Sequence, residues 1–401
     1  MSTSSTAADP VAGSAGAPRR SLAPDLARGL MLLVIAVVHA HMYVNATAYL
    51  PAGYPTEGGP LDRLAAGALT LLADGRGYPM FAALFGYGLA RILVREEARG
   101  RGWPAVRRLL RRRAWWLLVF GACHGVLLFG GDILGPYGLL SLLFVSALRL
   151  SDRSLLRLAV CCAVVLPVLY NAVYVGLVTA TGAGASSAQG SGDYLADMLL
   201  RVGSWPFTTV LFAIGGAAPL LVGMWAGRRG LLDHPERHRT LLRRTAAVGL
   251  GAAVAGGLPL ALVNALVWDD ASTVAMTVAS VLHTVSGYLG GFGYAALVGL
   301  LAARLADRRG PVVTALAGCG QRSMTCYLLQ SVAWLVLFAP FALGLAGHIG
   351  VASSLLVGAA VWLTGIAVAE LLRHANRRGP AEALIRRLTY GRRSATPTPT
   401  G

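Results

Sequence analysis

The chain has 401 residues, of which 55% are hydrophobic and 13% charged, and its formal net charge is +17. Globular proteins carry about 25% charged residues, so this composition excludes an ordinary soluble domain. Apart from histidines, all the basic residues are arginines, and they lie in short clusters between apolar runs. That distribution is typical of charges that set membrane topology, not of a nucleic-acid-binding surface. We therefore expect an integral membrane protein whose partner is the lipid bilayer, with no nucleic-acid partner.

Apolar runs of membrane length fill most of the chain between two polar ends. Residues 1–18 are small and polar and predict a disordered tail. Residues 19–390 predict one all-α domain, a polytopic transmembrane bundle, because each bilayer span needs about 20 apolar residues. About ten spans are expected, near residues 26–45, 78–96, 113–130, 133–149, 155–178, 206–227, 245–268, 275–303, 321–345 and 349–372. Residues 61–72 predict a shorter interfacial or re-entrant helix, and 391–401 a flexible basic tail rich in Thr and Pro.

Positive charge is distributed very unequally between alternate loops. One set of loops, together with both ends of the chain, holds nearly all the arginines, whereas the other set holds Arg63, Arg76 and Arg201 with several aspartates. Because arginine-rich loops stay in the cytoplasm, both termini are expected there. The all-arginine composition, rich in Gly and Ala, further indicates a bacterial protein of the cytoplasmic (inner) membrane.

Ionisable residues within the expected spans are the main functional signal, because each is costly in lipid unless it is paired or hydrated. Arg28 and His39 are eleven residues apart, and the third span repeats this spacing with Arg113 and His124. Eleven residues return to nearly the same side of a helix after a rise of about 16 Å. Each pair therefore predicts an arginine at the cytoplasmic edge and an imidazole deep in the membrane. Asp132 follows in a glycine-flanked turn at the outer surface.

His283, in the eighth span, is expected about two turns below the outer end and could converge with His39, His124 and Asp132. A structural interpretation remains open for each residue: histidines can be packing residues, arginines can be snorkelling anchors, and Asp132 can form a turn. For His39 and His124 the functional interpretation is favoured, because Leu or Val would pack there without desolvation cost. Imidazole also suits general-base work near neutral pH.

The ninth span opens with a polar segment, Gly320 to Ser331, which predicts an aqueous cavity or a polar seam. Its best candidates for ligand contact are Arg322, Tyr327 and Gln330. No metal is expected, because the histidines lack the His-x3-His spacing of a metal site and the cysteines lie in apolar segments without metal-ligand spacing.

Six short segments resemble, in order along the chain, the YeiB-like family of bacterial inner-membrane proteins, which carries a domain of unknown function. The segments are Asp25–Gly29, Met80–Gly88, His124–Leu134, Thr325–Ser331, Gly379–Glu382 and Leu388–Tyr390. Two positions depart from the family, which often has Asn in place of His39 and of Cys326. With His39 at the first position, the sequence resembles the membrane-bound acyltransferases, including the sugar O-acyltransferases. Their first span also places an Arg eleven residues before a His. This resemblance implies acyl transfer.

Three hypotheses follow. The first is an enzyme that moves an acyl group from a cytoplasmic acyl-CoA, its donor substrate, to a hydroxyl or amine of a small-molecule acceptor. His39 would act as base or acyl carrier, and His124 or Asp132 would assist. Three arginines would meet the donor phosphates: Arg28, Arg113 and Arg322. The second hypothesis is a transport-associated permease component with histidines that relay protons, and the third is a non-catalytic membrane scaffold.

Overall fold

The computed structural model describes residues 21–50, 52–181, 192–306 and 308–391. Within these ranges the regular structure is helical, apart from one antiparallel bridge between Tyr49 and Pro55, and the predicted all-α fold is confirmed. The predicted N-terminal tail lies outside the described residues, as does the C-terminal tail apart from Gly391.

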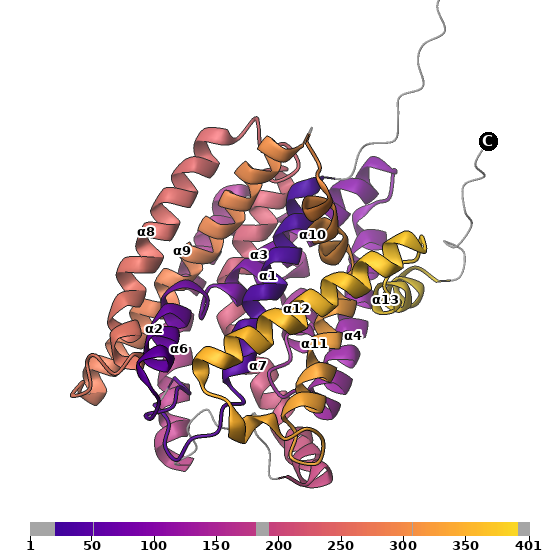
Figure 1. Cartoon of the computed structure of the whole chain (residues 1–401). Coiled ribbons are helices and arrows are strands. Elements are labelled where there is room, and N and C mark those ends of the chain that lie inside the picture. The colour runs from indigo at the N-terminus through magenta and orange to yellow at the C-terminus, as the bar shows by residue number, and fades with distance from the viewer. Residues whose placement is uncertain (1–20, 51, 182–191, 307, 392–401) are drawn as a thin grey trace, which may run out of the picture.

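The helices follow one another along the chain as labelled in Figure 1. Their bounds are α1 (Leu22–His41), α2 (Pro60–Leu72), α3 (Gly77–Ala98), α4 (Trp103–Leu127), α5 (Leu134–Phe144), η1 (Val145–Arg149), α6 (Asp152–Thr181), α7 (Tyr194–Arg228), α8 (Arg239–Asn264), α9 (Thr273–Leu305), α10 (Pro311–Gln321), α11 (Ser323–Phe338), η3 (Leu345–His348), α12 (Val351–His374) and α13 (Pro380–Tyr390). The elements η1 and η3 are short 3-10 helices.

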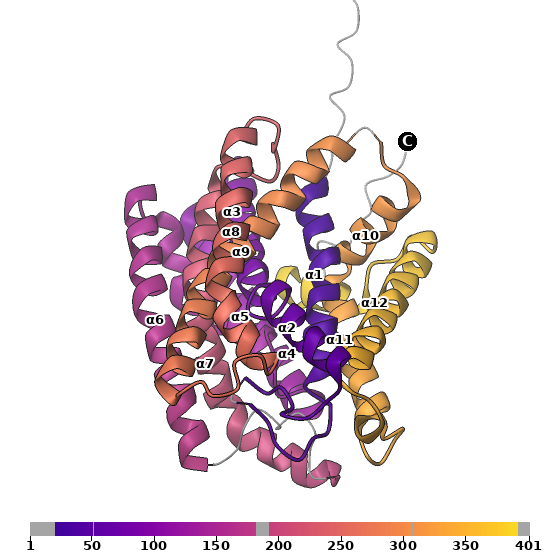
Figure 2. The same ribbon diagram turned by 60° about the vertical axis from the view of Figure 1, so that its left-hand side comes forward.

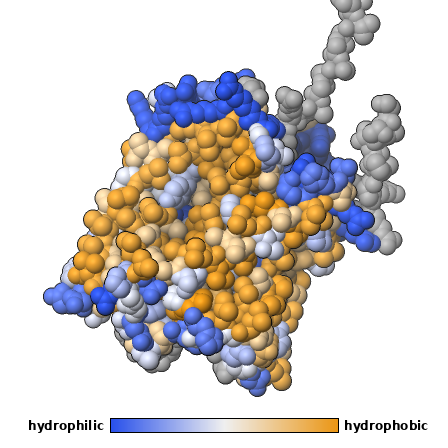
Figure 3. Space-filling model, in the orientation of Figure 1, coloured by the Kyte–Doolittle hydropathy of each residue, from blue (hydrophilic) through white to orange (hydrophobic). Residues whose placement is uncertain are grey.

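Seven of the described segments are long and apolar enough to cross a membrane: α1, α2 with α3, α6, α7, α8, α9 and α12. The unit of α5 and η1 and helix α11 are apolar but shorter. Helix α4 has 25 residues, and its first half is rich in arginine. An apolar flank lies between polar ends of the molecule (Figure 3). These features are those of a helical membrane protein.

Among the helix boundaries that differ from the sequence prediction, two are informative. Helix α7 begins at Tyr194 instead of near residue 206, because the Asp193 side chain accepts hydrogen bonds from the Leu195 and Ala196 N–H groups and caps an earlier start. The predicted ninth span, near residues 321–345, is shorter in the structure: α11 runs from Ser323 to Phe338, and Arg322 separates it from α10, which precedes the predicted span. Residues 61–72 form the separate helix α2, as expected.

Helix α1 is central to one side of the bundle and packs against α3, α9, α10, α11 and α12. In the turned view α10, α11 and α12 stand beside it (Figure 2). The close approach of α4 and α5 depends on glycine, because a Cβ placed on Gly121 would lie 2.1 Å from the Gly135 nitrogen. With no side chain at this crossing the two backbones touch, and the loop between them is held against α4.

Candidate active site

Three side chains from separate elements form one buried chain of hydrogen bonds. His124 lies near the end of α4, Asp132 in the following loop, and Ser331 on α11. The His124 Nδ1 is 2.9 Å from Asp132 Oδ1, and its Nε2 is 2.7 Å from the Ser331 Oγ. All three residues are at most 3% exposed. A carboxylate only accepts, so in the neutral imidazole Nδ1 donates its proton to Asp132 and Nε2 accepts the hydroxyl proton of Ser331.

Asp132 is fixed by the start of α5 as well as by His124. Its Oδ1 accepts a hydrogen bond from the Leu134 N–H (2.9 Å), and its Oδ2 accepts one from the Gly135 N–H (2.7 Å). These two N–H groups belong to the first turn of a helix, where they have no partner within the helix and where negative charge is stabilised. These hydrogen bonds fix the orientation of the carboxylate, and its bond to Nδ1 in turn orients the His124 ring.

His39 lies in the same region, on α1. Its ring centroid is 4.6 Å from that of Phe129, whose backbone N–H donates to the His124 carbonyl. His39 is also close enough to His124 for the two imidazoles to interact electrostatically. The structure thus brings together His39, His124 and Asp132, which sequence spacing had placed at a similar depth. The side chain of His39 is only partly buried, although its Nδ1 is enclosed.

Several polar atoms around this chain of hydrogen bonds are buried without a partner. The Tyr327 ring centroid is 5.0 Å from that of His124, and its hydroxyl, which lies beside the Ile133 backbone, donates no hydrogen bond to a described residue. Gln330 donates to the Leu32 carbonyl (3.0 Å), but its Oε1 is unpaired. The same holds for the Trp334 Nε1 and the His39 Nδ1. Buried polar groups are normally satisfied, so such a concentration indicates a place for a polar ligand.

His283 lies in a second polar cluster and makes no contact with His124. Its ring nitrogens are 2.8 and 2.9 Å from Arg76 Nη1. Arg76 also donates to the carbonyls of Asp74 and Ala253, each at 2.7 Å, and is completely buried. The expected convergence of three histidines is therefore wrong for His283. The reason is that Arg76, expected in an outer loop, is buried at the start of α3. There its guanidinium contacts Ala253 on α8 and His283 on α9.

Arg28 and Arg113 lie near each other on α1 and α4. Arg28 forms an ion pair with Asp25 at 3.4 Å. The Arg113 guanidinium lies 5.3 Å from the centre of the Phe85 ring, with Tyr390 and two cationic residues, Arg28 and Arg95, as further neighbours. Within the described part of the chain Arg113 has no ion-pair partner. A guanidinium that has two cationic neighbours and no carboxylate among the described residues favours an external anion.

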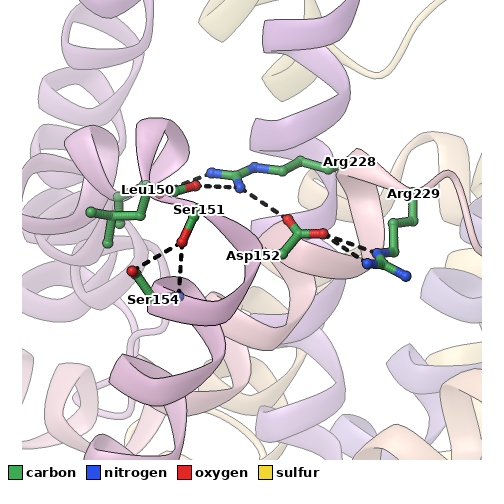
Figure 4. Close-up of polar contacts among 7 residues, drawn as sticks. Leu150, Ser151, Asp152, Ser154, Arg228 and Arg229 are labelled. Atoms are coloured by element: carbon green, nitrogen blue, oxygen red, sulfur yellow. Dashed lines mark hydrogen bonds and ion pairs between the residues drawn. The ribbon is translucent and has the colours of Figure 1, made fainter.

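Three other arginines at the ends of the bundle have hydrogen-bond partners within the chain, a carboxylate for two of them and backbone carbonyls for the third. Asp152 is bound by Arg228 at 3.3 Å and by Arg229 at 2.9 Å, and Arg228 also donates to the Leu150 carbonyl (Figure 4). Arg322 donates to the Arg377 and Gly318 carbonyls, at 2.7 and 3.2 Å. Its guanidinium thus links the α10–α11 junction to the segment after α12, which is a structural role. Arg113 therefore differs from these residues.

Sequence reasoning did not single out Ser331 or Trp334. Ser331 closes the polar segment that opens the ninth span, and it follows Tyr327 by four residues, so the two share one face of α11. This four-residue spacing is the sequence pattern that indicates Ser331 as a neighbour of Tyr327. No cluster of three metal-ligating side chains occurs among the residues that the structure describes.

Known proteins similar to this chain come from bacteria. A family model described as a protein of unknown function (DUF418) matches residues 226–392. The uncharacterized protein YxaH of Bacillus subtilis (strain 168) is 24% identical over 397 residues, covering 91% of this chain and 93% of the relative. The uncharacterized protein YeiB of Escherichia coli (strain K12) is 28% identical over 400 residues, covering 92% and 96%. Residues 226–392 thus match DUF418, and the chain is similar to YeiB-like proteins over nine-tenths of its length.

The DUF418 match covers only part of the site. It takes in α8 to α13 and therefore Ser331, whereas His39, His124 and Asp132 lie before it. The candidate site thus joins the DUF418 region to the N-terminal helices, along the length over which the two relatives also align.

Proposed function

We propose that this DUF418 protein is a membrane-bound acyltransferase, which moves an acyl group from a cytoplasmic acyl-CoA to a hydroxyl or amine acceptor. The observation that supports it is the buried His124, held by Asp132 on one ring nitrogen and facing a hydroxyl with the other. A carboxylate that fixes Nδ1–H leaves the Nε2 lone pair free to take a proton, which is the arrangement of a general base in acyl transfer.

The donor enters from the arginine-rich side. Arg28, Arg95 and Arg113 gather positive charge, and no carboxylate of the described residues pairs with Arg113. Phosphates of coenzyme A supply that charge. The rise of about 16 Å from Arg113 to His124 along α4 suits a donor with a long thioester arm. The unpaired polar atoms of His39 and Gln330 then serve the acceptor.

The proposed topology has ten spans, with both termini in the cytoplasm of a bacterium and the bundle in its inner membrane. Seven apolar segments are joined by α4, by α5 with η1, and by α11. At 1.5 Å per residue α4 is about 37 Å long, enough to cross the hydrocarbon core of about 30 Å. Helix α11 is shorter, and α10 lies next to it along the bundle (Figure 1). The unequal distribution of arginine between alternate loops supports this orientation.

Binding and transfer by the purified full-length protein in detergent test the proposal. Calorimetry with acetyl-CoA and longer acyl-CoAs should show saturable binding that Arg113→Ala weakens and that Arg112→Ala, an exposed neighbour on the same helix, leaves unchanged. Radiolabel from the acyl group should reach protein or acceptor in the wild type, and about 100-fold or more slowly in His124→Ala. If no acyl-CoA binds, the proposal is wrong.

One observation favours a second candidate, a transport-associated permease component that moves a small molecule. Arg76 and His283 form a buried ionisable pair, and such residues inside membrane proteins often mark transport or proton pathways. This function predicts proton-coupled uptake or export in vesicles that His283→Ala abolishes and that His124→Ala leaves intact.

A further inference from the structure

We propose that Ser331 is a nucleophile that carries the acyl group as an ester on its Oγ, with His124 as its base and Asp132 orienting the imidazole. The proposal rests on the acyl-transfer function above and adds a covalent intermediate to it. Hydroxyl, imidazole and carboxylate stand in the order that activates a serine: the Oγ is 2.7 Å from Nε2, and Nδ1 is 2.9 Å from the carboxylate.

The hydrogen bond made by Ser331 is unlike that of the other buried serines. Ser141, Ser286 and Ser354 each donate to a carbonyl of their own helix, three or four residues earlier. Such bonds are the ordinary way in which a serine hydroxyl is satisfied inside an apolar helix. Ser331 had the same option on α11, yet its hydroxyl faces an imidazole on α4, which is 207 residues away in sequence.

Tyr327 supplies the hydrogen-bond donor that an ester-forming site needs. The addition of a serine to a thioester builds negative charge on the carbonyl oxygen, and a fixed donor lowers the cost of that charge. The Tyr327 hydroxyl is buried, donates no hydrogen bond to a described residue, lies one helical turn before Ser331, and belongs to a ring packed 5.0 Å from the His124 ring. Its proton is therefore available to a new oxygen at this position.

The reaction has two balanced halves. In the first, the Ser331 Oγ attacks the thioester carbonyl carbon; the new C–O bond forms, the C–S bond breaks, and the hydroxyl proton passes through Nε2 to the departing thiolate. In the second, the acceptor hydroxyl or amine gives its proton to Nε2 and bonds to the ester carbonyl carbon. The bond from that carbon to Oγ breaks, and Oγ regains the proton from Nε2. No oxidant, metal or further reactant is required.

Trapping of the acyl-enzyme tests the proposal. The full-length protein is incubated with radiolabelled acetyl-CoA or palmitoyl-CoA without acceptor, denatured, digested and examined by mass spectrometry. One acyl group is expected on the peptide that contains Ser331. Ser331→Ala should abolish the label, His124→Ala should slow its appearance by about 100-fold or more, and Ser331→Cys should restore it as a thioester cleaved by neutral hydroxylamine. Ser141→Ala, a buried serine bonded to its own helix, should label like the wild type.

A fluorophosphonate probe, which reacts with activated serines, separates the two proposals. If Ser331→Ala melts like the wild type and still transfers acyl groups, the covalent intermediate is refuted and the acyltransferase function stands. If no acyl-CoA binds but the probe modifies Ser331 stoichiometrically, the nucleophile stands and the acyltransferase function fails. If the folded wild type accepts neither an acyl group nor the probe on Ser331, the serine is a structural link between α4 and α11 and the proposal is wrong.

Discussion

His124 and His283 are both buried imidazoles within helices of an apolar bundle, but their neighbours carry opposite charges. His124 faces a carboxylate on one side and a hydroxyl on the other. His283 faces the guanidinium of Arg76, whose remaining hydrogen bonds go to backbone carbonyls. A carboxylate stabilises the imidazolium that forms when the ring takes a proton, whereas a guanidinium opposes it. Both imidazoles are buried in helices, but only His124 has partners that would suit a general base.

The largest effect is expected from removing each histidine in turn. His124→Ala should lower the rate of acyl transfer by about 100- to 10,000-fold, the usual contribution of a general base. His283→Ala should leave the rate within a few-fold of the wild type, because its ring does not contact the site. Initial rates of label transfer by the purified variants measure both. Equal losses would remove the functional distinction between the two clusters.

Arg76→Met is expected to have the next largest effect, and on stability. It leaves the Asp74 and Ala253 carbonyls without their donor, and each buried unsatisfied group costs about 1–3 kcal/mol. The thermal midpoint in detergent should fall clearly, while Arg63→Met, at an exposed position of α2, should leave it unchanged. A variant at Arg76 that is fully stable but inactive would move the active site to the second cluster.

Gly121→Ala sharpens the comparison at a smaller scale. Its Cβ would meet the Gly135 backbone at 2.1 Å and push α5, with Asp132, away from His124. We expect a loss of about 1–3 kcal/mol of stability, as for other overpacked sites, together with slower transfer. Gly203→Ala is the matched control, since its Cβ would meet nothing within 4 Å. Unchanged transfer in a folded Gly121→Ala variant would mean that the Asp132 position is not critical.

The smallest effect is expected in the loop between α1, which bears His39, and α2. There the Thr47 hydroxyl and backbone N–H donate to Glu57, which holds the pKa of that carboxyl below its usual value. A lowered pKa stabilises the fold above the ordinary Glu pKa, and this contribution is lost as pH falls through the lowered value. Thr47→Val should therefore lower the thermal midpoint slightly at pH 7 and converge with the wild type in acid. A difference that grows in acid would contradict this assignment.

Sequence patterns predicted the all-α fold and two members of the hydrogen-bonded chain, His124 and Asp132, but not the third, Ser331. The eleven-residue spacing placed His39 and His124 at a similar depth, and the glycine-flanked Asp132 fell beside them because the turn connects directly to α4. Ser331 was not predicted, since a serine in an apolar helix ordinarily bonds to its own backbone, and its partner is far away in sequence. Arg76 was assigned to a loop because a charge in the membrane is costly, and only the packing of α8 and α9 shows how it is satisfied.

The helices that bear the site have a consequence for how the protein is made. His124 and Ser331 lie on α4 and α11, and neither helix is among the seven that are long and apolar enough to cross a membrane by length and composition. An arginine-rich helix and a short one insert poorly alone, so both depend on neighbours already in the bilayer. The hydrogen bond between them can form only after α11, late in the chain, has found α4. Catalytic competence would then report on completed insertion, and a truncated chain would be inert even where its first helices are correctly placed.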